Sequence, residues 1–78
     1  MKVTILKPNT CLFEGQAELL QLPGISGLFE LMENHAPIIS ALKVGTIRLV
    51  EEGGEERLFE VKSGVLKAQR NEVLVLVQ

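Results

Sequence analysis

The chemically reactive side chains of this 78-residue chain are few and far apart in sequence. His35 is the only histidine and Cys11 the only cysteine. Neither lies in a nucleophile elbow or in a metal-ligand spacing, and a zinc site needs three or four ligands. A Cys–His dyad brought together by the fold is the enzyme alternative, but we favour His35 as a loop residue that bonds backbone or a partner. The sequence therefore predicts no catalytic, metal or cofactor site.

The glycines allow a phosphate-loop interpretation, because Gly24 and Gly27 follow a predicted strand. The segment lacks a Lys-Ser/Thr ending and a following long helix, so no helix N-terminus is available to hold phosphate. We interpret both glycines as turn residues. Four glutamates around Gly53 and Gly54 form the one acidic cluster, which predicts a solvated hairpin tip; they are Glu51, Glu52, Glu55 and Glu56.

Composition excludes several classes of protein. The net charge of −2, with lysine and arginine scattered, argues against nucleic-acid binding. No stretch approaches the ~20 apolar residues of a membrane span. A lone cysteine fits a reducing compartment, and we expect the chain in the cytosol or on the cytosolic side of something larger. The chain is 46% hydrophobic, with a mean hydropathy of +0.25. Some of this apolar surface should therefore be covered by a partner.

Alternation of apolar and polar residues with a period of two dominates the chain and predicts strands. The expected strands are 3–6, 17–22, 46–51, 57–62, 65–69 and 72–77, with shorter runs at 12–13 and 38–42. Pro23-Gly24, Gly53-Gly54 and Arg70-Asn71 are expected to form the sharp turns, the second as a two-residue hairpin loop. The fold class predicted is all-β: one domain over 1–78, a small two-sheet β-sandwich of short, mostly antiparallel strands.

Two apolar segments are harder to place. Residues 28–32 are expected to form a strand or a bend, because Gly27 and Pro37 leave too little length for a helix. Half or more of the apolar residues between Leu28 and Leu42 should point inward, and the others could offer a contact surface. The strand at 73–77 is apolar on both faces, so we expect it to be covered on both sides.

The order of several short motifs resembles the ε-subunit head domain of F-type ATP synthases. The matching elements are Leu22-Pro23-Gly24-x-x-Gly27, then Asn34-His35-Ala36-Pro37, then Leu42-x-x-Gly45. Further matches are Leu12-Phe13-x-Gly15, Ser63-Gly64-Val65-Leu66 and Asn71-x-Val73-x-Val75-Leu76. Each element alone is weak, and the His-Ala-Pro element is the most telling. Together they cover essentially the whole chain in the order that the family shows.

The resemblance implies a non-catalytic rotor subunit that couples the γ subunit to the membrane c-ring during ATP synthesis. Catalysis would lie in other subunits of this proton-translocating complex. The implied location is the cytoplasmic face of the bacterial inner membrane, as a peripheral part of the complex, rather than the chloroplast stroma. Residues 28–32 would face the ring, and Asn34, His35 and Pro37 would lie near γ. The full set of interface candidates is Leu28, Phe29, Glu30, Leu31, Met32, Glu33, Asn34, His35 and Pro37.

Three features depart from the family pattern. Relatives commonly carry glycine where this chain has Glu30, so the backbone there must suit a side chain. Some relatives place an acidic residue at Leu28, and here Glu30 or Glu33 would supply the carboxylate. Many relatives continue into a C-terminal helical hairpin, whereas this sequence ends at Gln78. The sequence is either a naturally short form or one from which the hairpin was removed, and in both cases the resemblance implies that this polypeptide neither binds ATP nor inserts an inhibitory helix. The alternative is a free-standing β-sandwich that binds a peptide or ligand, including as a homodimer.

Overall fold

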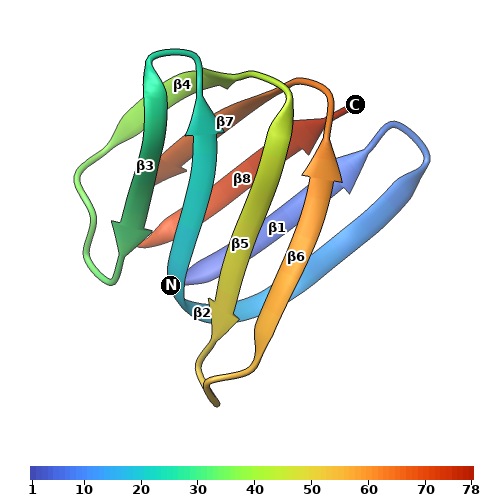
Figure 1. Ribbon diagram of the computed structural model, residues 1–78. Helices are drawn as coiled ribbons and strands as arrows, with labels where there is room; N and C mark the ends of the chain where they lie inside the picture. The colour runs from blue at the N-terminus through green and yellow to red at the C-terminus, as the bar shows by residue number, and fades with distance from the viewer.

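A computed structural model describes all residues, 1–78, as eight β-strands joined by short turns (Figure 1). The strands are β1 (Lys2–Lys7), β2 (Thr10–Gly24), β3 (Gly27–Met32), β4 (Ile38–Leu42), β5 (Gly45–Glu51), β6 (Glu56–Val61), β7 (Gly64–Gln69) and β8 (Glu72–Val77). The prediction of an all-β chain is confirmed. None of its segments is a helix with the length and apolar character that a membrane crossing requires.

The strands form two layers that share one long strand (Figure 1). One layer contains β3, the C-terminal half of β2, β5 and β6, and the other contains β4, β7, β8, β1 and the N-terminal half of β2. We call them the β5 layer and the β8 layer. All pairings are antiparallel except that between β1 and β8. The predicted sandwich of mostly antiparallel strands is confirmed.

The strand β2 is longer than predicted because Gly15 does not break it. The pairing register shifts between Ala17 and Leu19 on β2, and between Ile5 and Leu6 on β1. Such irregularities add a residue on one strand and bend it. The bend lets a single strand leave the β8 layer and enter the β5 layer, so it joins the two.

The turn expected at Pro23-Gly24 lies two residues later. Both residues belong to β2, and the loop is Ile25-Ser26, between the paired Gly24 and Gly27. A Cβ on Gly24 would lie 2.8 Å from the carbonyl oxygen of Gly27 and 2.8 Å from Cε1 of Phe29. Glycine is therefore required at position 24 because the backbone of Gly27 and the ring of Phe29 approach it closely. Gly27 has another role: its φ of 129° supplies the positive φ of the turn.

The loop of the β5–β6 hairpin has three residues, 52–54, between the hydrogen-bonded Glu51 and Glu55, and not the two residues predicted from Gly53-Gly54. The backbone amide of Gly54 donates a hydrogen bond to the carbonyl oxygen of Glu51 (2.8 Å), and the backbone amide of Glu51 donates one to the carbonyl oxygen of Glu55 (2.8 Å). Only Gly54 has a positive φ, at 89°. Hairpin loops of three residues place glycine at this last, left-handed position.

The two-residue turn between β7 and β8 is confirmed at Arg70-Asn71. Both residues have positive φ, 50° and 59°, although neither is glycine. Asparagine tolerates this left-handed region better than a residue with a long side chain. Arg70 therefore occupies a backbone conformation that its side chain does not favour.

Arg70→Asn should raise the free energy of unfolding by about 0.5–1 kcal/mol, because it relieves this unfavourable backbone conformation. In a domain of this size the thermal midpoint should rise by a few degrees. Thermal unfolding followed by circular dichroism would measure the gain. Gln69→Asn, at an exposed neighbour with ordinary φ, should bring none. An equal gain from both variants would show that the effect does not come from the turn.

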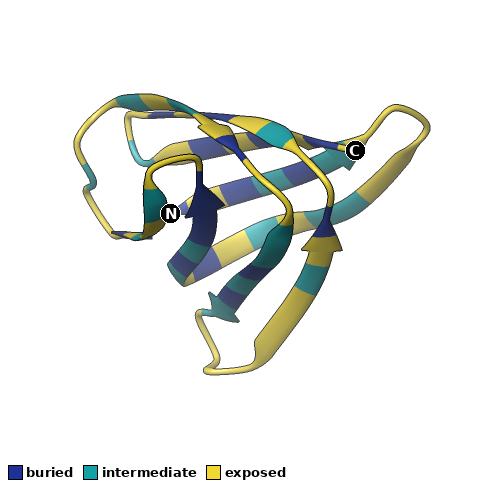
Figure 2. Ribbon diagram, turned by 45° about the horizontal axis from the view of Figure 1, so that its top comes forward, coloured by how far each residue is buried: buried dark blue, intermediate teal, exposed yellow.

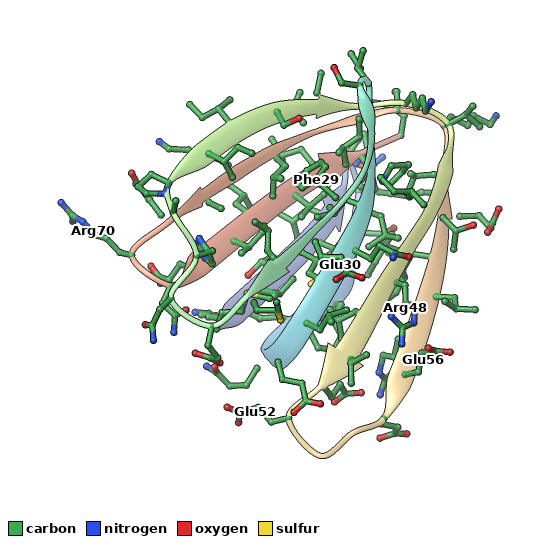
Figure 3. All side chains as sticks on the ribbon, turned by 60° about the vertical axis from the view of Figure 1, so that its left-hand side comes forward. Phe29, Glu30, Arg48, Glu52, Glu56 and Arg70 are labelled. Atoms are coloured by element: carbon green, nitrogen blue, oxygen red, sulfur yellow. The ribbon has the colours of Figure 1, made fainter.

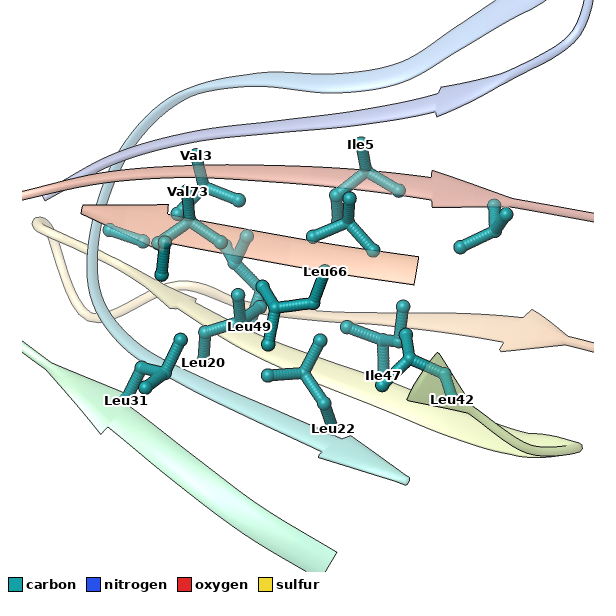
Figure 4. Packing of buried hydrophobic residues seen from close by; sticks show 14 of the residues in the cluster. Val3, Ile5, Leu20, Leu22, Leu31, Leu42, Ile47, Leu49, Leu66 and Val73 are labelled. Carbon is teal, nitrogen blue, oxygen red and sulfur yellow. The ribbon is translucent and has the colours of Figure 1, made fainter. Parts of the chain in front are cut away.

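Sixteen buried apolar side chains fill the space between the layers. Val3, Ile5 and Leu66 meet Leu20 and Leu49 across the sandwich (Figure 4). Buried and exposed residues alternate along the strands (Figure 2), as the period-two pattern predicts.

The strand β8 contradicts the prediction that it is covered on both sides. Val73, Val75 and Val77 are buried, but Leu74 and Leu76 are 40% and 49% exposed. They lie on the face of the β8 layer that points away from the other layer. The apolar side chains on this outer face therefore do not belong to the hydrophobic core.

Candidate functional site

The two reactive residues lie in different parts of the fold. Cys11 is exposed at the start of β2, next to the β1–β2 hairpin, with its Sγ 3.6 Å from the carbonyl oxygen of Phe13. His35 lies in the β3–β4 loop, on the opposite side of the molecule (Figures 1 and 2). The fold therefore does not form the Cys–His dyad. Nowhere do three His, Cys, Asp or Glu side chains gather in a way that could hold a metal ion.

Residues 28–32, expected to face a partner together, form most of strand β3, so alternate side chains point in opposite directions. Leu28 and Met32 are exposed, at 68% and 58%. Glu30 is also exposed, with a backbone φ that is not positive, and accepts a hydrogen bond from Nε2 of Gln21 (3.0 Å). Phe29 packs against the core, and Leu31 belongs to it. Truncating Leu31 should thus impair folding rather than a contact with a partner.

The loop after β3 is held by a polar network around Glu33. Its carboxylate accepts hydrogen bonds from the α-amino group of Met1 and from Nδ2 of Asn71 (2.8 Å). The Oδ1 of Asn71 in turn accepts from the backbone amide of Asn34 (2.8 Å), whose φ is 61°. The α-amino group also donates to the carbonyl of Ala17 (3.0 Å). The network therefore fixes the start of the loop against β2 and the β7–β8 turn.

The histidine of this loop has one bonded and one unbonded ring nitrogen. Nδ1 of His35 lies 3.2 Å from the carbonyl oxygen of Ala36 and can donate to it. Nε2 is buried without a hydrogen-bond partner. A hollow of about 560 Å³ adjoins the ring, lined by β3, the loop and Ile38. Pro37 and Asn34, beside it, are exposed. The loop thus combines a fixed backbone with a surface that a partner can reach.

The pKa of Glu33 is lowered, first by the hydrogen bond from the α-amino group of Met1 and then by that from Asn71. A carboxyl group whose pKa is lower in the folded than in the unfolded chain stabilises the fold above its unfolded pKa, near 4.5. This contribution is lost as the pH falls through the lower, folded pKa. Glu33→Gln should therefore reduce stability at pH 7, and the difference from wild type should shrink below about pH 4.5. Urea unfolding at several pH values measures it. A difference independent of pH would contradict the prediction.

The acidic cluster is partly paired. Glu51 accepts from Nε of Arg57, and Glu56 from Nε of Arg48. Figure 3 shows Arg48 beside Glu56, and Glu52 at the tip of the hairpin. The hydrogen bond to Glu51 raises the pKa of Arg57. Exposed pairs of this kind add little stability.

One surface was not predicted from the sequence: the outer face of the β8 layer. Its exposed apolar residues are Ile39 (72%), Val65 (50%), Leu74 (40%) and Leu76 (49%), with Leu6 half-buried beside Leu76. We call this set the β8 outer face. A groove of about 560 Å³ lies at one end of it, lined by Leu6, Val65 and Leu76 among others. In the sequence, the sign of this outer face was the run 73–77, which is apolar on both faces of the strand.

An all-β sandwich with exposed apolar residues on a sheet face and beside a fixed loop, and with no cluster of reactive groups, is typical of a protein-interaction domain. The family model described as the β-sandwich domain of the ATP synthase delta/epsilon chain matches residues 1–78. The chain therefore belongs to this family.

Relatives support the same assignment. The ATP synthase epsilon chain of Chlorobium limicola is 32% identical over 77 residues, which cover 99% of this chain and 88% of the relative. That of Chromohalobacter salexigens is 39% identical over 72 residues, and that of Clostridium novyi 36% over 75. The chain spans only 51% and 57% of these two relatives. The resemblance predicted from the ordered loop motifs is thereby confirmed.

Two solved structures share the fold. A chain in the mitochondrial ATP synthase of Euglena gracilis, solved with OSCP, F1 and c-ring, has a TM-score of 0.90 at 13% identity. The match covers 96% of this chain and 48% of that one. A chain in the central stalk and c-ring of the Tetrahymena thermophila mitochondrial enzyme has a TM-score of 0.80 at 14% identity, covering 99% and 62%. At these identities the likeness establishes the common sandwich.

Proposed function

We propose that this chain is a non-catalytic rotor subunit that couples the γ subunit of an F-type ATP synthase to the membrane c-ring. The observation that carries the proposal is the match of the family model over residues 1–78, together with an epsilon-chain relative covered over 88% of its length. Both structural neighbours come from ATP synthase assemblies that include a c-ring, one of them with the central stalk, and this supports the proposal. The complex would lie at the cytoplasmic face of a bacterial inner membrane.

Two surfaces suit two partners. The outward side chains of β3 and the adjoining carboxylate, namely Leu28, Glu30, Met32 and Glu33, would face the polar loops of the ring. Asn34, His35 and Pro37 would contact γ, and the β8 outer face would extend that contact. Phe29 and Leu31 would support these surfaces from inside, because they pack in or against the core.

The sandwich suits a mechanical role because its two layers cannot slide freely past one another. Forty backbone hydrogen bonds lie within its strands, and β2 passes through both layers. Close-packed interiors transmit strain with little compression. Torque applied at the β3 side by the ring would thus reach γ with little elastic loss. Neither nucleic acid nor ATP is needed for this role.

Co-purification tests the proposal. The chain, expressed with γ and c subunits from the same genome, should elute with both from a detergent-solubilised complex. Substituting Leu28→Asp together with Met32→Asp should release the ring but keep γ. A chain that sediments as a stable homodimer and binds neither subunit would refute the proposal and favour the free-standing sandwich.

His35→Ala should weaken the binding of γ about five- to tenfold, an effect of about 1–1.4 kcal/mol. The imidazole lies beside an open hollow, and His35 is not a member of the hydrophobic core cluster. The urea midpoint should therefore change little. Isothermal titration with purified γ measures the affinity, and Cys11→Ala, on the opposite side of the molecule, is the control. If wild type, His35→Ala and Cys11→Ala bind γ with equal affinity, His35 is not part of the interface.

A further inference from the structure

A second, smaller hollow on the outer side of the β8 layer lies between two lysines. It has a volume of about 280 Å³ and is lined by Lys2 of β1 and Lys67 of β7, with Leu74 of β8 between them. Lys67 is paired with Leu74 in the register of β7 and β8, and Thr4 with Leu74 in that of β1 and β8. Lys2 itself is paired with Glu72, so the two lysines lie on either side of β8, with Glu72 and Leu74 of that strand between them.

Neither lysine is neutralised within the chain. The three ion pairs of the structure involve Met1, Arg48 and Arg57, and none involves a lysine. Glu72, which is paired with Lys2 in the register of β1 and β8, is the only carboxylate that lines the hollow, and it forms no ion pair with either lysine. Two positive charges therefore face one negative charge at this place, and Arg70 follows in the adjoining turn (Figure 3).

The glutamates are distributed unevenly between the two layers. Of the ten acidic residues, all glutamates, only Glu14 and Glu72 lie on strands of the β8 layer. The other eight lie on the β5 layer, its loops or the part of β2 that enters it: Glu18, Glu30, Glu33, Glu51, Glu52, Glu55, Glu56 and Glu60. Glu14 pairs with Thr4 and Glu72 with Lys2, so both glutamates share the outer side of the β8 layer with the unpaired lysines, whereas the β5 layer carries most of the acidic residues.

We propose that Lys2 and Lys67 bind a carboxylate side chain of the protein that docks on the β8 outer face. Under the proposed function, on which this inference rests, that protein is γ. Its matching surface would carry an aspartate or glutamate next to an apolar strip that covers Leu74 and Leu76. Complementary charges at the edge of an apolar contact increase the association rate and reject partners of the wrong sign.

The same chemistry argues against a second copy of this chain as the occupant. Two copies related by a twofold axis would bring together two β8 outer faces with the same lysines, and neither face carries the excess of carboxylates that a complementary partner would offer. Like charges across an interface oppose association. A partner with an acidic border meets no such repulsion, apart from that of Glu72.

Charge reversal in the full chain tests the proposal through the affinity for γ. Lys67→Glu should weaken binding about tenfold and Lys2→Glu with Lys67→Glu more, and both should reduce the dependence of affinity on salt concentration. Lys43→Glu, an exposed lysine between β4 and β5 that lines neither hollow of this face, is the control and should stay within twofold. Urea unfolding verifies that each variant is folded.

Carbodiimide cross-linking provides an independent readout, because it joins a lysine amine to a carboxylate in direct contact. In the wild-type complex, mass spectrometry should find Lys2 or Lys67 linked to an aspartate or glutamate of γ. If wild type binds γ, but the lysine variants bind equally well and neither lysine is cross-linked, this inference is overturned and the proposed function stands. If wild type does not bind γ, both fail.

Discussion

Replacing Leu74 and Leu76 together by glutamate should weaken binding to γ by about a hundredfold or more while the chain stays folded. Both side chains lie on the outer side of the β8 layer and are 40% and 49% exposed. The substitution removes the apolar centre of the proposed contact. It also places two carboxylates where we expect the partner's own acidic residue. Loss of burial and repulsion therefore act in the same direction.

Affinity measured by titration or biolayer interferometry, next to a urea midpoint, separates binding from folding. Leu58→Glu is the matched control, because Leu58 is 61% exposed on β6 in the other layer. The control should bind γ like wild type. Undiminished binding of the double variant would remove the β8 outer face from the interface and leave only the loop around His35.

Gly64→Ala should lower the free energy of unfolding by about 2–3 kcal/mol, a large share of the stability of a domain this small. A Cβ at Gly64 would lie 2.7 Å from the carbonyl oxygen of Leu76 and 3.0 Å from Cγ1 of Val77. The carbonyl belongs to the β8 backbone, which the pairing with β7 and β1 holds in place. The clash therefore cannot be relieved by turning a side chain.

The urea midpoint at constant m-value measures this loss. Gly53→Ala is the control, since a Cβ there meets nothing within 4 Å and the φ of Gly53 is not positive. Its effect should stay within about 0.5 kcal/mol. Because alanine restricts the unfolded backbone and thereby favours folding, equal losses at both glycines would contradict the clash as the cause.

The sequence predicted the fold class because alternation is a local signal. Ile47 and Leu49 are buried on either side of half-buried Arg48, as the pattern indicates. The turn chemistry was less specific. Gly24 looks like a turn glycine in the sequence, but its role is close approach to Phe29 and the backbone of Gly27. Such a contact depends on a neighbouring strand and has no local signature.

The candidate site was predictable only in part, for the same reason. The motif around His35 located the loop, but the direction of each side chain on β3 depends on register. Leu31 and Met32 are adjacent and equally apolar, yet one is in the core and the other is exposed. The network that holds the loop joins Glu33 to Met1 and Asn71. Contacts between residues this distant in sequence leave no periodic trace in a single chain.

The parallel pairing of β1 with β8 has a consequence for how the protein is made. β1 is synthesised first and β8 last, and Val3 and Ile5 sit beside Val73 and Val75 in the finished sandwich. At about 5–20 residues per second, a ribosome needs on the order of ten seconds to connect them. Through that interval the earliest apolar strand has no lasting neighbour on one edge. We therefore expect the sandwich to close only after β8 has left the ribosome.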